Sequence, residues 1–123
     1  YRIEVSLQAF NLKVYDADRV IADYRIGVAK ASTPTPVGIF FTTELVRPVN
    51  PSGPYGPYAY GLSGFSDVLT SFGGGPGQLG IHGTNQPGLL GREVSSGCIR
   101  LANADITRLA GFIPLGTPVV VND

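Results

Sequence analysis

Glycine and proline interrupt this chain so often that long helices are disfavoured. The chain has 17 glycines and 10 prolines among its 123 residues. Both residue types are costly inside helices and common in turns. Hydrophobic residues still make up 43 % of the chain, which suffices for a folded core. We therefore expect a mainly β protein rich in loops, organised as a single domain over residues 1–123.

Alternating apolar residues predict strands at both ends of the chain. Residues 2–8 alternate, and the pattern returns around Leu12 before a turn at 16–18. Two or three antiparallel strands are therefore expected to open the fold. A β-branched and aromatic run at 37–41 predicts another strand, and the apolar run at 118–123 predicts a final buried one.

Two other segments have distinct signatures. Residues 103–112 predict a helix, with Asn103 as its N-cap and Gly111 near its end, and a shorter helix is expected after Ser66. The stretch 47–61 contains four prolines and three tyrosines. We expect it to be an ordered surface loop, because tyrosine side chains need something to pack on.

Charge and cysteine content exclude several classes of protein. Nine basic side chains balance nine acidic ones, so nothing suggests binding to nucleic acid or to an anionic membrane surface. A single cysteine cannot form an intrachain disulfide, and with a single histidine it forms no ligand-spaced cluster, so neither a metal nor a cofactor is expected. The chain begins at Tyr1 with no visible signal peptide, as expected of a mature or excised domain.

The single cysteine and the single histidine both stand in polar, glycine-bearing stretches. Cys98 follows Ser-Ser-Gly, and a predicted strand at 78–84 places His82 near its end. The intervening loop is long enough to bring the two together for nucleophilic catalysis. Gly97 permits a sharp turn that aims its amide and that of Cys98 at one oxygen. The alternative is an inert core cysteine and an ordinary histidine.

Four segments form a larger pattern: IHGT at 81–84, SSGCIRLANADITRL at 95–109, PLGTPVVV at 114–121 and, more weakly, TPTPVGIF at 33–40. These segments resemble the catalytic domain of the L,D-transpeptidases, the family that builds and remodels bacterial peptidoglycan. The resemblance implies the fold of that family, a β-sandwich or irregular mixed β-barrel with one or two short helices.

The resemblance also implies catalytic roles. Cys98 would be the nucleophile that attacks the carbonyl between an L-centre and a D-residue of a tetrapeptide stem. His82, oriented by the main-chain carbonyl of Gly83, would pair with the thiolate, protonate the departing D-alanine and activate the incoming amine. The backbone amides of Gly97 and Cys98 would hold the oxyanion.

The substrate-binding residues implied by the resemblance are Arg100, Ser96 and Tyr60. Arg100 would bind a substrate carboxylate, or alternatively tie the cysteine loop to the helix. Ser96 stands where many members have a second histidine, which leaves one imidazole for all acid–base work. Residues 54–60 fall where members carry a lid, so Tyr58 and Tyr60 are candidates to line a groove, with core packing as the alternative.

The implied function is a peptidoglycan L,D-transpeptidase that uses no cofactor. Its partners would be stem peptides, with carbapenem-type β-lactams as covalent inhibitors, and its location would be extracytoplasmic, in the bacterial cell envelope. One alternative is an L,D-carboxypeptidase or endopeptidase that uses water as the acceptor. Another, from a different class, is a catalytically degenerate peptidoglycan-binding module, against which the intact pair of His82 and Cys98 argues.

Overall fold

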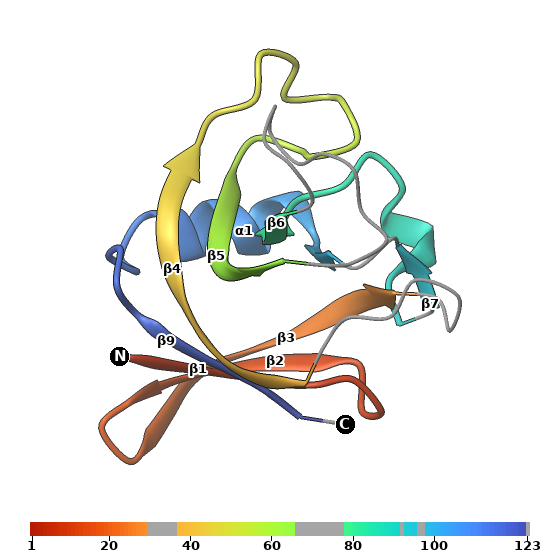
Figure 1. The fold of residues 1–123 in the computed structure, drawn as a ribbon. Helices are drawn as coiled ribbons and strands as arrows, with labels where there is room; N and C mark the ends of the chain where they lie inside the picture. Colours follow the sequence, from red (N-terminus) through yellow and green to blue (C-terminus); the bar gives the residue numbers. More distant parts are fainter. Residues whose placement is uncertain (30–36, 66–77, 92, 96–97, 123) are drawn as a thin grey trace.

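The computed structural model describes residues 1–29, 37–65, 78–91, 93–95 and 98–122, and these are mainly β (Figure 1). The strands are β1 (Arg2–Ser6), β2 (Asn11–Asp16), β3 (Arg19–Ala29), β4 (Gly38–Val46), β5 (Ala59–Phe65), β6 (Gln78–His82), β7 (Glu93–Ser95), β8 (Ile99–Leu101) and β9 (Pro118–Asn122). A short 3-10 helix, η1 (Pro87–Leu89), precedes β7, and the helix α1 (Asn103–Ala110) follows β8. The predicted mainly β class is confirmed.

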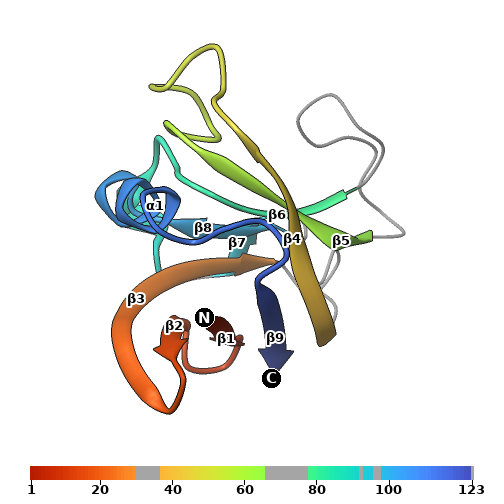
Figure 2. The same ribbon diagram turned by 90° about the vertical axis from the view of Figure 1, so that its left-hand side faces the viewer.

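The strands form a mixed sheet that closes on itself. Its order is β2-β1-β9-β4-β5-β6-β8-β3-β7, and a further pairing between β2 and β3 completes the ring. The long strand β3 makes this closure possible, because its first part pairs with β2 while Ile26 and Gly27 pair with β8. Figure 2 shows β3 curving around the molecule. The sequence suggested either a β-sandwich or an irregular mixed barrel, and the fold is the barrel.

Strand alternation explains the first three strands. Ile3 and Val5 of β1 are buried, as are Leu12 and Val14 of β2, while the residues between them are only partly covered. One buried face for each strand fixes the pairing register, because a slip of one residue would turn the apolar side chains outward. β1, β2 and β3 pair antiparallel in sequence, as predicted.

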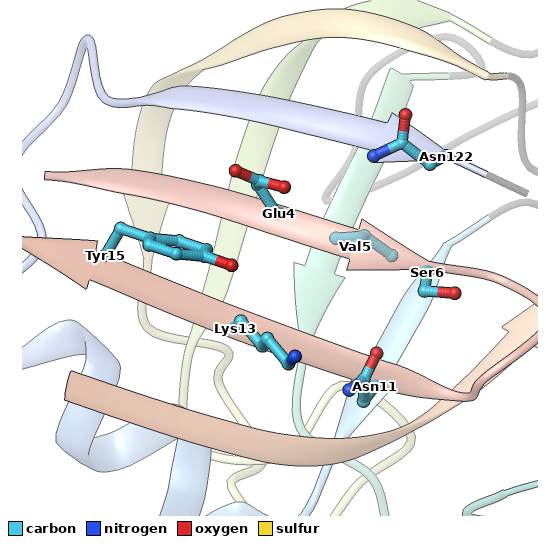
Figure 3. Close-up of a pocket in the computed structure, with 7 residues that line it drawn as sticks. All are labelled: Glu4, Val5, Ser6, Asn11, Lys13, Tyr15 and Asn122. Atoms are coloured by element: carbon cyan, nitrogen blue, oxygen red, sulfur yellow. The ribbon is translucent and has the colours of Figure 1, made fainter. Parts of the chain in front are cut away.

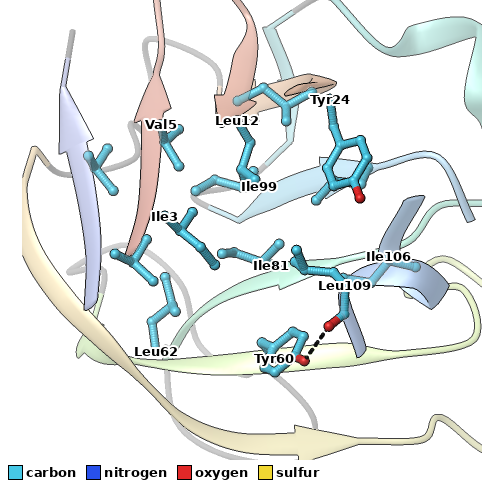
Figure 4. Packing of buried hydrophobic residues seen from close by; sticks show 14 of the residues in the cluster. Ile3, Val5, Leu12, Tyr24, Tyr60, Leu62, Ile81, Ile99, Ile106 and Leu109 are labelled. Carbon is cyan, nitrogen blue, oxygen red and sulfur yellow. Dashed lines mark hydrogen bonds between the residues drawn. The ribbon is translucent and has the colours of Figure 1, made fainter. Parts of the chain in front are cut away.

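The barrel interior is filled by one apolar cluster (Figure 4). Strand residues such as Ile3, Ile81 and Ile99 meet Ile106 and Leu109 of α1 there, all nearly inaccessible to solvent. Burying an aliphatic side chain of this size contributes about 1.5–3 kcal/mol. The cluster therefore anchors α1 against the strands that precede it in the chain.

The helix α1 lies where the sequence predicted, but its N-cap differs. Ala102 occupies the N-cap position and makes no side-chain capping bond, so Asn103 is the first helical residue. The prediction of Asn103 as N-cap is wrong because its side-chain oxygen instead accepts a hydrogen bond from the Thr84 amide. The helix ends at Gly111 as expected. No helix among the described residues is long and apolar enough to cross a membrane.

The tyrosine-bearing segment is an ordered loop between β4 and β5, as predicted, but it is shorter than the sequence suggested. Ala59 and Tyr60 already belong to β5 and pair with β6. Strand alternation therefore governs which way the Tyr60 side chain points. The short helix expected after Ser66 lies outside the described residues.

Candidate active site

The candidate site is built on the parallel strands β6 and β8, which lie side by side in the sheet. Ile81 is opposite Ile99, and His82 is opposite Arg100. Successive side chains of a strand point to opposite faces. The two isoleucines face the core, so His82, Arg100 and Cys98, which lies two residues before Arg100, belong to the other face. The structure thus brings the single histidine and the single cysteine onto one face of adjacent strands.

Strand β5 completes this face on the other side of β6. Ala59 is opposite His82, and it packs with Cys98 in a small cluster of its own. Val46 and Tyr55 pack against the cluster. Only 7 % of Cys98 and 3 % of His82 is exposed. Both reactive side chains are therefore largely withdrawn from solvent, outside the main core cluster.

The imidazole of His82 is held in one tautomer. Its Nδ1 lies 2.5 Å from the carbonyl oxygen of Gly83. A carbonyl oxygen can only accept, so Nδ1 carries the proton and Nε2 keeps its lone pair. The Tyr55 ring meets the imidazole edge to face, with centroids 4.9 Å apart and an interplanar angle of 86°. The ring is thus oriented by the backbone and packed on one side by an aromatic residue.

Burial lowers the pKa of His82 to about 4. The bond to the Gly83 carbonyl opposes this shift, whereas the positive charge of Arg100 adds to it. A buried cation loses hydration that nearby dipoles replace only in part. His82 is therefore a neutral base at neutral pH.

Burial also raises the pKa of the Cys98 thiol to about 11. A hydrogen bond from the Gly80 backbone and the charge of Arg100 both lower it, but they do not offset the loss of hydration. Cys98 is consequently a neutral thiol at neutral pH. With His82 also neutral, neither member of the pair carries a charge at rest.

Arg100 is the charged member of the site. Its Nε is buried and has no hydrogen-bond partner in the described part of the chain. Buried donors are almost always paired, and this one lies on the strand next to His82. Its charge also acts on both His82 and Cys98.

The remaining predicted site residues are Ser96, Gly97 and Tyr60. Ser96 and Gly97 lie outside the described residues. Tyr60 is fully buried, and its hydroxyl lies 3.1 Å and 2.9 Å from the carbonyl oxygens of Leu109 and Ile113, so it lies in the core and not beside Cys98 (Figure 4).

The tyrosine that reaches the site is Tyr55, which the sequence did not single out. Tyr58 is partly buried against the main core cluster, with the Arg47 guanidinium 5.8 Å from its ring centroid. Ala59 lies between Tyr58 and Tyr60 and faces the site instead. The alternation of strand β5 would have identified this arrangement, had its first residue been known.

A separate shallow pocket lies on the outer surface of β1, β2 and β9 (Figure 3). Its polar lining comprises Glu4, Ser6, Asn11, Lys13, Tyr15 and Asn122. These strands are not neighbours of β6 or β8 in the sheet. The pocket is therefore distinct from the cysteine–histidine site. No group of three histidine, cysteine or acidic side chains suited to a metal ion occurs within the described ranges.

A thiol and an imidazole base lie on one face of adjacent strands of a closed mixed barrel, an arrangement suited to nucleophilic catalysis. The particular family follows from comparison with known sequences. The family model of the YkuD L,D-transpeptidase catalytic domain matches residues 1–121, and the chain belongs to this family.

Individual relatives agree with this assignment. The chain is 41 % identical over 121 residues to the Bacillus licheniformis protein YkuD, which is named as an L,D-transpeptidase. That alignment covers 98 % of this chain and 65 % of the relative, so the chain spans less than two thirds of the relative's length.

Solved structures share the fold. The catalytic domain of the Enterococcus faecium L,D-transpeptidase, determined by NMR, is 26 % identical and has a TM-score of 0.72, covering 98 % of this chain and 95 % of that one. The carbamoyl enzyme of Ldtfm with avibactam is 25 % identical with a TM-score of 0.71, covering 99 % of this chain and 48 % of that one.

Proposed function

We propose that this chain catalyses L,D-transpeptidation on peptidoglycan stem peptides through an acyl-enzyme at Cys98. The observation that carries the proposal is the position of Cys98 and His82 on one face of adjacent parallel strands. Membership of the L,D-transpeptidase family supports the substrate class. Because peptidoglycan lies outside the cytoplasm, an extracytoplasmic location in the bacterial cell envelope is part of the proposal.

The first half-reaction forms a thioester. The Cys98 sulfur attacks the carbonyl carbon between the L-centre and D-alanine while the thiol proton passes to Nε2 of His82. This transfer suits a neutral resting pair, because the charges appear only as the carbonyl becomes an oxyanion. The backbone amides of Gly97 and Cys98 would stabilise that oxyanion. The carbon–nitrogen bond then breaks, and His82 returns its proton to the departing amine of D-alanine.

The second half-reaction releases the acyl group. The amine of an acceptor stem attacks the thioester carbonyl and gives its proton to Nε2 of His82. The carbon–sulfur bond breaks, and the proton returns from His82 to the sulfur of Cys98. One imidazole therefore acts alternately as base and acid, and the chain has only one histidine to do so.

Arg100 is proposed to bind a carboxylate of the stem peptide. Its buried Nε, which has no hydrogen-bond partner among the described residues, and its position opposite His82 support this role. An arginine–carboxylate pair inside a site of low polarity is strong and directional. Ser96 remains a predicted contact of the same substrate.

The experiment that tests the proposal is incubation of the protein with tetrapeptide stems. Cross-linked dimers with release of D-alanine support transpeptidation, and Cys98→Ala should yield none. Trimmed monomers alone would show hydrolysis, with water as the acceptor. Binding of stems without any product, in wild type and variant alike, would favour a binding module with a degenerate site.

Carbapenem-type β-lactams are proposed as covalent inhibitors that acylate Cys98. Support comes from the carbamoyl enzyme that Ldtfm forms with avibactam, a complex of a protein 25 % identical to this chain. A strained cyclic amide offers an activated carbonyl to the same nucleophile that would attack the stem peptide.

A further inference from the structure

One peptide unit links the imidazole of His82 to the helix α1. The carbonyl of the Gly83–Thr84 peptide accepts the Nδ1 proton of His82. The amide of the same peptide donates to Oδ1 of Asn103, with a nitrogen–oxygen distance of 2.8 Å. The carbonyl and the amide of a trans peptide point in opposite directions. The peptide is therefore bonded on both sides, to the histidine and to the asparagine.

The side chain of Asn103 has no capping role that would explain its placement. Ala102 is the N-cap and makes no side-chain capping bond. The backbone carbonyl of Asn103 accepts a separate hydrogen bond from the Thr107 hydroxyl, 2.7 Å away. The Asn103 amide group instead leaves its own helix to reach a loop 19 residues earlier in the chain.

Two glycines make room for this contact. A side chain on either Gly56 or Gly83 would place its first carbon against Oδ1 of Asn103. Such a carbon on Gly56 would also lie 2.7 Å from the Gly83 α-carbon, and Gly56 has a positive φ of 66°. The two backbones thus approach closely around the asparagine oxygen. The amide of Gly83 also donates to the Tyr58 carbonyl, so the Gly83–Thr84 loop is held on several sides.

The physical consequence of this arrangement reaches Nε2 of His82. An acceptor on the amide of a peptide polarises the whole unit and strengthens its carbonyl as an acceptor. A stronger acceptor at Nδ1 favours the tautomer with the lone pair on Nε2 and makes that nitrogen more basic. The effect is largest where water is excluded, and only 3 % of His82 is exposed.

We propose that Asn103 is a positioning residue for His82, which it orients through the Gly83–Thr84 peptide. The proposal rests on the proposed function only for its effect on turnover, since the orientation of the imidazole is a property of the protein itself. Asn103 touches neither the substrate nor the reacting atoms in this role. In other nucleophilic sites a third group, often a carboxylate, orients the histidine directly. Asn103 would orient His82 in the same way, but through an intervening peptide.

The test compares Asn103→Ala with Asn103→Asp and with Asn85→Ala. Aspartate keeps an acceptor oxygen, and Asn85 is an exposed asparagine in the loop next to Thr84. Alanine is the best helix former, so Asn103→Ala should leave α1 intact. The first readout is the nitrogen NMR spectrum of the imidazole, which is unambiguous because the chain has one histidine. The second is the rate at which a carbapenem acylates Cys98, followed by intact mass.

Asn103→Ala should show a measurable population of the Nε2-protonated tautomer, and its Cys98 should be acylated about tenfold more slowly than in wild type. The acylation rates of Asn103→Asp and Asn85→Ala should stay within about threefold of wild type.

A folded Asn103→Ala with the wild-type tautomer would overturn the proposal, even if its melting temperature falls. Should Asn103→Ala fail to fold, a folded Asn103→Asp in which Nε2 is mainly protonated would overturn it, and retention of the Nδ1-protonated form would support it. If wild type is not acylated at all, the proposed function fails, while the NMR spectra still decide the role of Asn103.

Discussion

The two faces of the β5–β6–β8 segment differ sharply, although their residues alternate along the same strands. The inner face presents Tyr60, Ile81 and Ile99 to the main core, where even the tyrosine hydroxyl has carbonyl partners. The outer face presents His82 and Cys98, whose neutral forms are favoured by burial. Each reactive residue directly follows or precedes a core isoleucine.

This difference separates residues that stabilise the fold from residues of the proposed catalytic site. Burial on the inner face stabilises the fold, because apolar groups lose nothing by leaving water. Burial on the outer face opposes ionisation of both titratable groups and leaves Nε of Arg100 without a partner within the described residues. We expect substitutions on the outer face to change reactivity, and substitutions on the inner face to change the free energy of unfolding.

The largest expected effect is on turnover in His82→Ala. Loss of the only imidazole removes both the base and the acid, so turnover should fall by at least about a thousandfold. The variant should still unfold cooperatively, because His82 lies outside the main core cluster. Turnover of stem peptides and thermal unfolding of the same sample check this. Near-full activity in a folded variant would refute the assignment, and loss of a cooperative transition would give His82 a core role.

Ile99→Ala should give the converse result. Removing this side chain leaves a cavity beside Ile81, at a cost of about 2–5 kcal/mol in the free energy of unfolding. The matched control is Cys98→Ala, one residue away on the other face, which should destabilise the chain by about 1 kcal/mol or less. Urea unfolding of both variants measures the difference. Equal destabilisation would mean that the two faces are not energetically distinct.

Acid should destabilise the protein through His82. Its folded pKa of about 4 lies below the usual 6.5, so the unfolded chain binds the proton first. The neutral imidazole of His82 contributes about 3 kcal/mol to the free energy of unfolding relative to its protonated form. This contribution is fully present above pH 6.5 and is lost as the pH falls towards 4. Denaturant unfolding across this range, with His82→Gln as reference, isolates the effect. Parallel curves for the two proteins would contradict the burial of a neutral imidazole.

Tyr60→Phe should have the smallest effect. The change removes the hydroxyl that is hydrogen-bonded to the carbonyls of Leu109 and Ile113. The free energy of unfolding should fall by about 1–2 kcal/mol. Tyr58→Phe is the control, with a change expected below about 0.5 kcal/mol. The rate of acylation at Cys98 should be unchanged in both variants. Slower acylation in folded Tyr60→Phe would return Tyr60 to the substrate-binding residues that the sequence suggested.

Local patterns predicted most of the fold, because strand alternation and helix periodicity are written in neighbouring residues. The opening strands, the helix at Asn103–Ala110 and the final strand lie where the sequence placed them. Closure of the barrel depends on pairings between distant strands, such as β2 with β3 and β1 with β9. No short window of sequence specifies such pairings, so the choice between sandwich and barrel stayed open.

The sequence predicted that Cys98 and His82 would come together, but not which residues surround them. Cys98 and His82 stood out as single reactive residues in polar, glycine-bearing stretches. The orientations of Tyr60 and Tyr55 depend on where β5 begins, which the sequence left uncertain. Asn103 has the residue type of a helix cap, and only a contact across 19 residues gives it another partner. Propensity describes local choices, whereas this contact needs the close approach of Gly56 and Gly83.

The most direct test of a reactive outer face is the intact mass of the protein after exposure to a carbapenem. We predict that wild type gains the mass of one inhibitor molecule, that peptide mapping assigns the adduct to Cys98, and that Cys98→Ala gains nothing. The rate of adduct formation should fall in His82→Ala. An unmodified wild-type protein, or the same adduct on Cys98→Ala, would contradict the assignment of this face as a site of acyl transfer.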